Sequence, residues 1–424
     1  MLIHMPAIDF PRQPCYTKPN KIPFFGGRPV RILLFYSAIE SFNYYADQLN
    51  AQLNQKGHET FILDLRNPPE GDPHSYANFV QYIQSPVDAV IGYDGFGMKE
   101  ELFIELWDEQ GAVAVNIEVD PPLRFHPTMQ RHPRKYIQLC CDKNHVEYVK
   151  KYFGQEVEHV GFMPHAGTYM PHQQVKPFSE RKYDILFTGT YYKPEDQMKK
   201  IDQWFPKGEP MNQFYYEMAA LMCKDSALST EQAALETIRK FEMEVTDAQL
   251  KTIFRCSEPL DWMARMYYRG RVIQTLAQAK LEVWLLGRGW ENHPASEFPN
   301  VHRIDDRIPF ADTLSYLADA KISLNVMPWF KAGTHERLFN SMLQHSLALT
   351  DKSSWIEENF IAGEEIAVYD LERLEELPHY ARELLGDPDR AKQMIQKGYE
   401  KTVKNYTWEN CVKQVLDTIE KIYG

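Results

Sequence analysis

The pattern of apolar and polar positions divides most of the chain into two halves, in each of which buried strands alternate with helices. In the first half, continuous apolar runs such as RILLFY at 31–36 and AVAVNIEV at 112–119 have the length of strands buried on both faces. Stretches with helical spacing separate them, such as SFNYYADQLNAQLNQKGH at 41–58. The alternation returns with YDILFTGT at 183–190 and KISLNVM at 321–327. It predicts an α/β protein with two parallel, doubly wound domains of the Rossmann-like kind.

The segments between these patterns indicate the domain boundaries. Residues 1–29 contain six prolines and little periodicity, which predicts an N-terminal arm. We expect a first domain at 30–165 and, after a linker rich in Pro, Gly and polar residues, a second domain at 180–404. Within the second domain, 191–263 has helical spacing but no clear strand, so we expect a helical insertion there. A last helix at 405–424 closes the chain.

Composition excludes several classes of partner. With 47 basic and 59 acidic residues the net charge is −12, which argues against nucleic acid or an anionic membrane as the main partner. The six cysteines are scattered, and adjacent Cys140–Cys141 suits neither a disulfide framework nor a zinc site. The N-terminus has no basic, apolar leader, and no apolar run approaches the ~18 residues of a membrane span. We therefore expect a cytoplasmic protein with reduced thiols.

The densest group of polar residues follows a strand in the second domain. In LNVMPWFKAGTHERLFNSMLQHSLALT, at 324–350, a loop with Gly333 leads to a helix that we expect Thr334 to cap. A helix N-terminus offers free N–H groups and suits a diphosphate, to which Arg337 would add a charged contact. Glu336 and Asn340, one turn apart, would hold sugar or ribose hydroxyls, and His335 belongs to the same cluster. The alternative is an ordinary capped helix with a solvated outer face.

Two glycine turns also lie where ligands bind in such sheets, at the carboxyl ends of strands. One is Thr188-Gly189-Thr190, and the other contains Arg288 between two glycines. Glycine allows a phosphate to approach the backbone closely, and Arg288 would add positive charge. The alternative is that these glycines serve the geometry of the turns alone.

In the first domain, carboxylates follow two strands and provide candidates for a catalytic base. Transfer of a group to an acceptor hydroxyl needs a base to deprotonate that hydroxyl, and we expect Asp94, Asp120 or His126 to serve. An Asp before proline, such as Asp120, is also a common turn former. His165, near the linker, either contacts the donor phosphate or packs at the hinge. We expect no metal site, because the sequence has no HExxH, no paired CxxC and no Asp-x-Asp after a strand.

The second half of the chain resembles a known family. The run from KISLNVM to EEIAVY, at 321–369, resembles glycosyltransferases of the CgeB type, named after a spore maturation protein. The family pattern of an I-x-L-N strand, a Gly-rich loop, E-R-x-F-E and a strand ending in L-L-T-D is matched by Ile322, Leu324, Asn325, Gly333, Glu336, Arg337, Phe339, Thr350 and Asp351. The resemblance extends over most of 87–424 and is weakest at 191–263.

The resemblance implies the GT-B fold, with the donor mainly in the second domain and the acceptor mainly in the first. It also implies transfer without a bound metal, and a last helix that crosses back to the first domain. Where the family has a second Glu that holds the donor ribose, this chain has Asn340. An amide still donates and accepts hydrogen bonds, but the strength of a charged acceptor is lost.

We therefore expect a glycosyltransferase that moves a sugar from a nucleotide diphosphate to a protein, peptide or small-molecule acceptor, with no separate cofactor. Two alternatives are a nucleotide-sugar epimerase of the same fold and a catalytically silent GT-B scaffold, for which Asn340 is the best argument. The insertion at 191–263 carries aromatic and Met-rich helical faces. These faces pack internally, meet the acceptor, or join two copies in a homo-oligomer.

Overall fold

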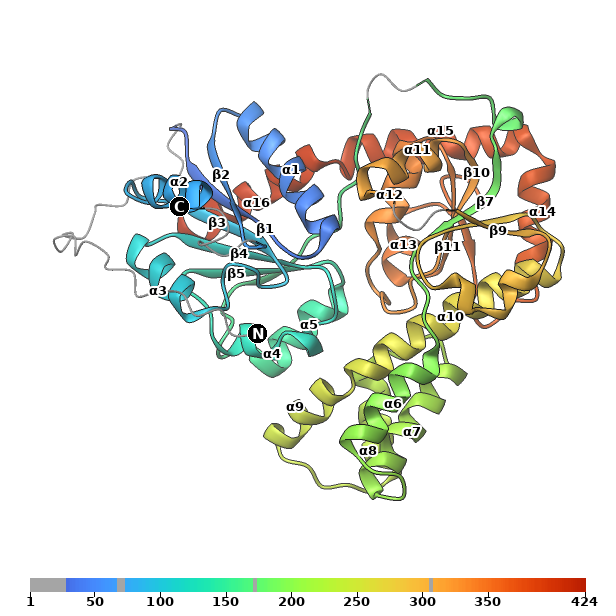
Figure 1. Ribbon diagram of the computed structural model, residues 1–424, viewed down its shortest axis with the longest axis horizontal. Coiled ribbons are helices and arrows are strands. Elements are labelled where there is room, and N and C mark those ends of the chain that lie inside the picture. Colours follow the sequence, from blue (N-terminus) through green and yellow to red (C-terminus); the bar gives the residue numbers. More distant parts are fainter. Residues whose placement is uncertain (1–27, 67–72, 171–173, 305–307) are drawn as a thin grey trace.

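The structure is a computed structural model that describes residues 28–66, 73–170, 174–304 and 308–424. Apart from residues 28 and 29, the expected N-terminal arm lies outside the described residues. Two α/β domains lie side by side, and a group of helices projects below them (Figure 1).

The first domain is built on a six-stranded, fully parallel sheet with the order β2-β1-β3-β4-β5-β6. Its strands are β1 (Arg31–Tyr36), β2 (Glu59–Asp64), β3 (Ala89–Tyr93), β4 (Val113–Glu118), β5 (Tyr136–Cys140) and β6 (Val160–Phe162). Every residue of β3, β4 and β5 is buried, as the continuous apolar runs predict for a sheet covered on both faces.

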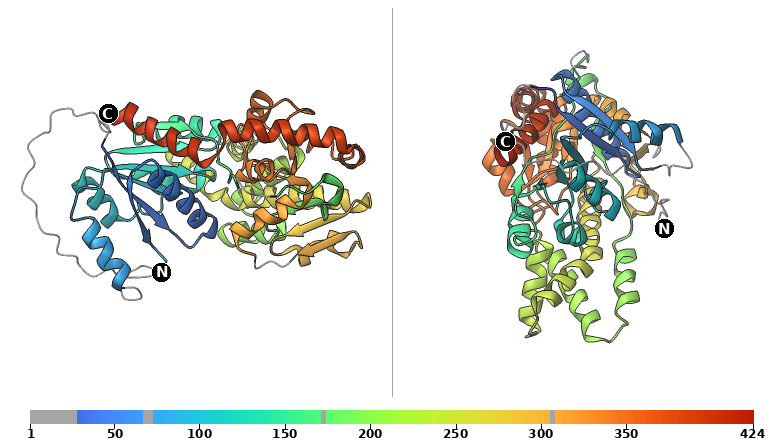
Figure 2. Two further views of the ribbon diagram at one scale, coloured as in Figure 1. Left: turned by 90° about the horizontal axis from the view of Figure 1, so that it is seen from above. Right: turned by 90° about the vertical axis from the view of Figure 1, so that its left-hand side faces the viewer.

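Helices cover both faces of this sheet. One face packs on α1 (Glu40–Gln55) and on the last helix of the chain, α16 (Trp408–Tyr423). Figure 2 shows α16 running from the second domain back along the first. The other face packs on α2 (Pro73–Tyr82), α3 (Glu101–Gln110), α4 (His126–Gln130) and α5 (Lys143–Phe153).

The second domain repeats this architecture with the sheet order β12-β11-β10-β7-β8-β9, again fully parallel. Its strands are β7 (Tyr183–Thr188), β8 (Val283–Leu286), β9 (Val301–Ile304), β10 (Ala320–Asn325), β11 (Leu347–Asp351) and β12 (Ala367–Tyr369). The sequence pattern did not predict β9, because this edge strand is short and only partly buried.

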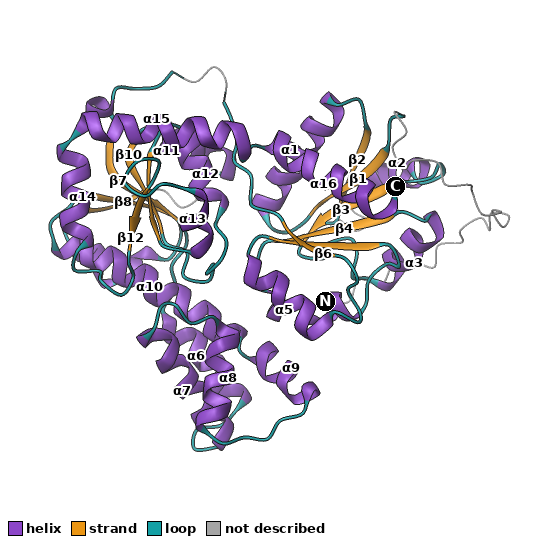
Figure 3. Ribbon diagram, turned by 180° about the vertical axis from the view of Figure 1, so that it is seen from behind, coloured by secondary structure: helices purple, strands orange, loops and turns teal. Residues whose placement is uncertain are grey.

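Helices cover this second sheet as well (Figure 3). One face packs on α10 (Glu258–Gln278), α14 (Leu377–Gly386) and α15 (Pro388–Asn405). The other packs on α11 (Thr313–Ala318), α12 (Glu336–Leu343) and α13 (Ser354–Asn359). Two doubly wound sheets of six parallel strands confirm the predicted fold class.

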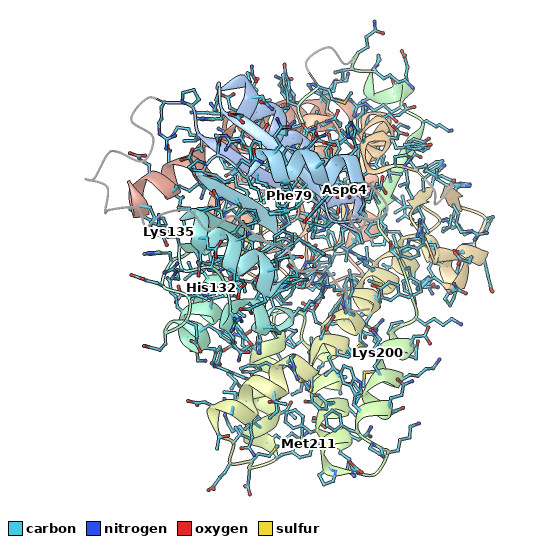
Figure 4. All side chains as sticks on the ribbon, turned by 60° about the vertical axis from the view of Figure 1, so that its left-hand side comes forward. Asp64, Phe79, His132, Lys135, Lys200 and Met211 are labelled. Carbon is cyan, nitrogen blue, oxygen red and sulfur yellow. The ribbon has the colours of Figure 1, made fainter. Side chains whose placement is uncertain are left out.

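The segment at 191–263 forms a helical subdomain made of α6 (Pro194–Trp204), α7 (Pro210–Lys224), α8 (Thr230–Lys240), α9 (Asp247–Cys256) and the first turns of α10. In Figure 4, Met211 marks the far end of this subdomain, below Lys200 and away from the sheet residue Asp64. Most of its aromatic and Met-rich faces pack against one another, with Phe214 and Met218 fully buried, whereas Tyr216 and Phe241 remain 40% and 36% exposed.

The insertion also contacts the first domain. The hydroxyl of Tyr152 on α5 donates a hydrogen bond to Glu231 on α8 across 2.6 Å. Lys151 forms an ion pair with the same carboxylate at 2.9 Å. The insertion therefore bridges the two sheets. Within the described ranges, no helix is both long enough and apolar enough to cross a membrane.

Candidate active site

The candidate site lies where the carboxyl ends of the two sheets meet. On the first domain, Asp94 follows β3 and Asp120 follows β4. On the second, the turn after β7 and the loop between β10 and α12 face them. The contact is direct, because Asp142 after β5 pairs in a β-bridge with Gly333 of that loop. This is the edge at which parallel α/β sheets bind ligands.

Helix α12 begins one residue later than predicted, and its cap is different. The N-cap is His335, whose Nδ1 accepts a hydrogen bond from the backbone N–H of Arg337 across 3.3 Å. Thr334 does not cap the helix: it is fully buried, and its hydroxyl contacts the sulfur of Met327. Every residue of α12 is buried, so the alternative of an ordinary helix with a solvated face is also wrong.

Two guanidinium groups lie together at the carboxyl ends of β7 and β10. Arg337 donates from Nη1 to Oδ1 of Asn325 across 2.7 Å, and Arg269 of α10 donates from Nη1 to the carbonyl of Thr190 across 2.9 Å. Both lie against the ring of Phe187, with centroid distances of 5.5 and 5.8 Å. In the described part of the chain, neither has a carboxylate within salt-bridge distance. They form a buried, positively charged pair, which we call the arginine pair.

The surroundings of the arginine pair disfavour its charge. Burial and the neighbouring charges of Arg337 and Arg265 lower the pKa of Arg269 to about 9. Burial also lowers the pKa of Arg337. The Nε of Arg269 has no hydrogen-bond partner among the described residues. Two buried like charges with unused donors match a dianionic ligand such as a diphosphate.

Sequence reasoning singled out Arg337 but missed Arg269. The missed signal is the spacing of Asp261, Arg265 and Arg269, which are four residues apart along α10. All three side chains are buried on a helix whose other buried positions are mostly apolar. Charged residues at i, i+4 and i+8 share one face of a helix, so this row indicated a polar face turned towards a site.

The two predicted glycine turns pack against each other. A Cβ on Gly287 would lie 2.3 Å from the carbonyl oxygen of Gly189, and one on Gly289 would lie 1.8 Å from that of Tyr191. Both turns therefore need glycine for their mutual backbone contact. Thr188 and Gly189 are partly exposed beside the arginine pair, and Arg288 is exposed at the rim. They remain candidates for contact with a bound donor.

Gly333 makes its close contact with protein. A Cβ at this position would lie 2.2 Å from the carbonyl oxygen of Cys141 and 2.8 Å from the Cα of Asp142. The carboxylate of Asp142 accepts from the N–H of Ala332 with one oxygen and caps α5 with the other, at 2.8 and 2.7 Å. The glycine is needed because the first domain packs directly on this loop.

Asn340 binds the interdomain linker. Its Oδ1 accepts a hydrogen bond from the backbone N–H of Thr168 across 2.9 Å, and Gln344 donates to the carbonyl of Thr168 across 2.8 Å. The hydroxyl of Thr168 contacts Tyr44 of α1 at 2.8 Å and Trp408 of α16 at 3.1 Å. The side-chain oxygen of Asn340 is thus engaged with backbone.

Glu336 and His335 face the first domain. Their side chains contact each other, and the ring of His335 stacks on that of His165 with centroids 5.9 Å apart. Burial lowers the pKa of His335 to about 4, so this imidazole is neutral at pH 7. Burial alone would raise the pKa of Glu336, but the two histidines and Arg337 outweigh it and hold the pKa low. The Nε2 of buried His165 has no partner among the described residues.

Asp94 and Asp120 differ in their suitability as a base. Burial and the negative charge of Asp120 raise the pKa of Asp94, whose Oδ1 accepts from the N–H of Val119 at 3.0 Å. For Asp120, burial is outweighed by Arg124 and Arg265, and its pKa is lowered. A base needs a pKa near the working pH, so Asp94 fits that role better.

Asp120 belongs to an ion-pair ring that joins the first domain to the insertion. Arg124 contacts Asp120 at 2.9 Å and Asp261 at 2.5 Å. Arg265 contacts the same two carboxylates, each at 3.0 Å. Both guanidiniums lie over the ring of Trp262, at 4.2 and 4.6 Å. These ion pairs keep the carboxylate of Asp120 negatively charged next to Asp94.

His126 does not join this group. It is buried under α5, where its Nε2 lies 2.7 Å from the hydroxyl of Tyr148 and its ring packs on Phe153. Burial lowers its pKa to about 4. In addition, no three His, Cys, Asp or Glu side chains in the described ranges are grouped so that they could hold a metal ion.

Comparisons with known proteins agree with this geometry. Residues 269–417, which include Arg269 and the whole of α12, match a family described as glycosyl transferase-like. A search of curated protein sequences finds no match.

Solved structures with the same architecture have very different sequences. Sucrose-phosphate synthase from Thermosynechococcus elongatus is 10% identical, with a TM-score of 0.52 over 93% of this chain and 99% of that one. A glycosyltransferase from Rickettsia africae is 9% identical, with a TM-score of 0.52 over 93% and 98%. HepE of Anabaena, in complex with UDP and glucose, is 9% identical, with a TM-score of 0.52 over 93% and 100%. The fold is therefore that of the GT-B glycosyltransferases.

Proposed function

We propose that this protein is a glycosyltransferase that takes a sugar from a nucleotide-diphosphate donor without a bound metal ion. The observation that carries the proposal is the arginine pair, Arg269 and Arg337, at the carboxyl ends of β7 and β10. The GT-B fold and the match of 269–417 to a glycosyl transferase-like family support it. The complexes of HepE with UDP support a uridine nucleotide as the first donor to try.

The arginine pair accounts for the part of the reaction that involves the leaving group. When the bond from the sugar to the diphosphate breaks, negative charge grows on the diphosphate oxygens. Two fixed guanidiniums in a buried site stabilise that charge without needing a cation. Glu336, His335 and His165 lie on the side facing the first domain, where they would hold sugar hydroxyls.

Asp94 accounts for the acceptor side. In an inverting transfer its carboxylate takes the proton from the acceptor hydroxyl while the oxygen bonds to the anomeric carbon. The raised pKa of Asp94 favours this proton transfer near neutral pH. Asp120, held ionised by Arg124 and Arg265, keeps that pKa high.

The two alternatives predict different behaviour. An epimerase acts on the donor alone and needs no acceptor, whereas the contact of the insertion with the first domain favours a two-substrate enzyme. A silent scaffold was suggested by Asn340, but this residue binds the backbone of Thr168. The amide of Asn340 therefore has a structural contact of its own, so its presence is no argument for lost activity. The more specific CgeB-type assignment, a cytoplasmic location and a homo-oligomer remain proposals.

The test measures the release of UDP from UDP-sugars and the binding of UDP, in the wild-type protein and in matched variants. We expect the protein to release UDP from at least one UDP-sugar in the presence of EDTA. Replacing either arginine (Arg269→Gln or Arg337→Gln) should weaken UDP binding about 10- to 150-fold, the range for a charged hydrogen bond. The control is Arg271→Gln, an exposed position on the same helix. Unchanged affinity in both variants, or activity that requires added Mn²⁺, would contradict the proposal.

A further inference from the structure

A small cavity lies where the first domain, the insertion and the loop after β10 meet. We call it the junction cavity, and its lining includes Leu123, His145, Tyr148, Thr230, Arg265 and Lys331. Its volume is about 50 Å³. Since a water molecule needs about 10–15 Å³ by the same measure, there is room for roughly three or four non-hydrogen atoms. The cavity thus fits a head group better than a whole sugar.

Two polar groups in this lining, one partly buried and one buried, have hydrogen-bonding capacity that the described protein groups do not use. The ammonium of Lys331 donates to the carbonyl oxygen of Ser226, and no described carboxylate lies within salt-bridge distance of its Nζ. The Nδ1 of His145, a side chain only 9% exposed, has no hydrogen-bond partner in the described part of the chain. A buried polar atom without a partner costs about 1–3 kcal/mol, which a ligand would recover.

The other charged groups of the lining are already paired. Glu231 is bound by Lys151 and Tyr152, and Asp261 by Arg124 and Arg265. This leaves one cation and one neutral imidazole for a ligand. The N-terminus of α8, at Thr230, adds partial positive charge at the same wall. The remainder of the lining is mostly proline, aliphatic and aromatic side chains, with the neutral polar Asn144 and Ser229.

We propose that the junction cavity binds an anionic group, a carboxylate or a phosphate, of a small acceptor whose adjoining part is apolar. The ammonium of Lys331 pairs with the anion, and His145 donates a hydrogen bond to it. The cavity is next to the reacting groups, because Arg265 lines it and also contacts Asp120, the neighbour of Asp94. That the ligand is the acceptor rests on the proposed function, whereas the binding of an anion does not.

The test measures by calorimetry how tightly the full chain binds two probes, phenyl phosphate and 3-phenylpropionate. Wild-type protein should bind at least one of them, and the preferred probe distinguishes phosphate from carboxylate. Lys331→Met should weaken that binding tenfold or more, and Lys331→Arg should restore part of it. The matched control is Lys352→Met, since Lys352 pairs with Asp370 at 2.7 Å and does not line the cavity.

Two further measurements keep the donor site and folding apart from this cavity. Arg337→Gln should leave probe binding within twofold, and Lys331→Met should leave UDP binding and the circular dichroism spectrum unchanged. If Lys331→Met is misfolded, His145→Phe serves in its place, with a loss of threefold or more expected. The proposal is overturned if neither probe binds at millimolar concentration. It is also overturned if Lys331→Met and His145→Phe bind the probe as tightly as the wild-type protein does. Loss of binding in Arg337→Gln overturns it as well. Failure of UDP binding alone would instead count against the proposed function.

Discussion

The backbone N–H of Thr168 donates a hydrogen bond to the Oδ1 of Asn340 across 2.9 Å, and this bond ties the interdomain linker to α12. Both residues are buried, at 8% and 4% exposure. The position at which the resemblance implies a ribose ligand therefore belongs to the hinge between the domains.

We predict that Asn340→Ala lowers the free energy of unfolding by about 1–3 kcal/mol, because it leaves the buried N–H of Thr168 without a partner. Asn340→Asp keeps an acceptor and should lose less. Urea unfolding measures both, and UDP affinity should change less than threefold in either variant. A large loss of UDP affinity at unchanged stability would return Asn340 to the donor site.

The arginine pair should destabilise the free protein and stabilise the bound one. Arg269 and Arg337 are close, buried and alike in charge, so they repel each other. Replacing one arginine should therefore lower the free energy of unfolding less when the other arginine is present than when it is absent. In a double-mutant cycle with Gln at both positions, we expect a repulsive coupling of about 0.5–1 kcal/mol in the unfolding free energy without ligand. Saturating UDP should reverse its sign. Coupling that is zero in both states would show that the two guanidiniums act independently.

Asp351 should make stability depend on pH. Burial raises its pKa from 3.8 to about 7, and its Oδ1 accepts from the N–H of Met327 at 2.8 Å. A carboxyl whose pKa is raised by folding favours the folded state below its unfolded pKa, and this contribution is lost as the pH rises through the folded pKa. Between pH 4 and pH 7, wild type should lose up to ~4 kcal/mol relative to Asp351→Asn.

Chemical denaturation at several pH values measures this difference, because Asn keeps the hydrogen-bond acceptor but does not titrate. The matched control is Asp389→Asn on the surface of α15, where the side chain is 88% exposed. The control should follow wild type at every pH. A difference between wild type and Asp351→Asn that stays constant from pH 4 to pH 7 would contradict the raised pKa.

Gly333→Ala should open the interface between the domains. Its Cβ would lie 2.2 Å from the Cys141 carbonyl oxygen and 2.8 Å from the Cα of Asp142, and these backbone atoms leave little room for adjustment. We expect a larger radius of gyration by small-angle scattering and loss of sugar transfer, with UDP binding retained. Gly386→Ala, which meets no atom within 4 Å, is the control. An unchanged radius of gyration would show that the loop adapts locally.

The sequence by itself determined the fold class. The strands β1, β4, β7 and β10 are mostly apolar on both of their sides, and a sheet covered on both faces is what buries most residues of such a strand. Short β9, at the sheet edge, has too little apolar length for this signal. The helical insertion was equally visible, because helical spacing is a local property of the chain.

The sequence also located α12 and Arg337, since a cluster of polar residues after a buried strand lies at the sheet edge that binds ligands. It left Asp94, Asp120 and His126 as equal candidates for the base. Only the tertiary structure separated them, because the pKa of each depends on groups distant in the chain: Asp120 beside Asp94, and Arg265 beside Asp120.

The same reason explains Arg269, Gly333 and Asn340. Each has a role that depends on a partner from another part of the chain: Arg337, the backbone of Cys141, and Thr168. Helical or strand periodicity shows which side of an element is buried, but it does not show which element covers that side. Local patterns therefore determined the elements and their order, whereas packing between the two domains decided which polar side chains share a site.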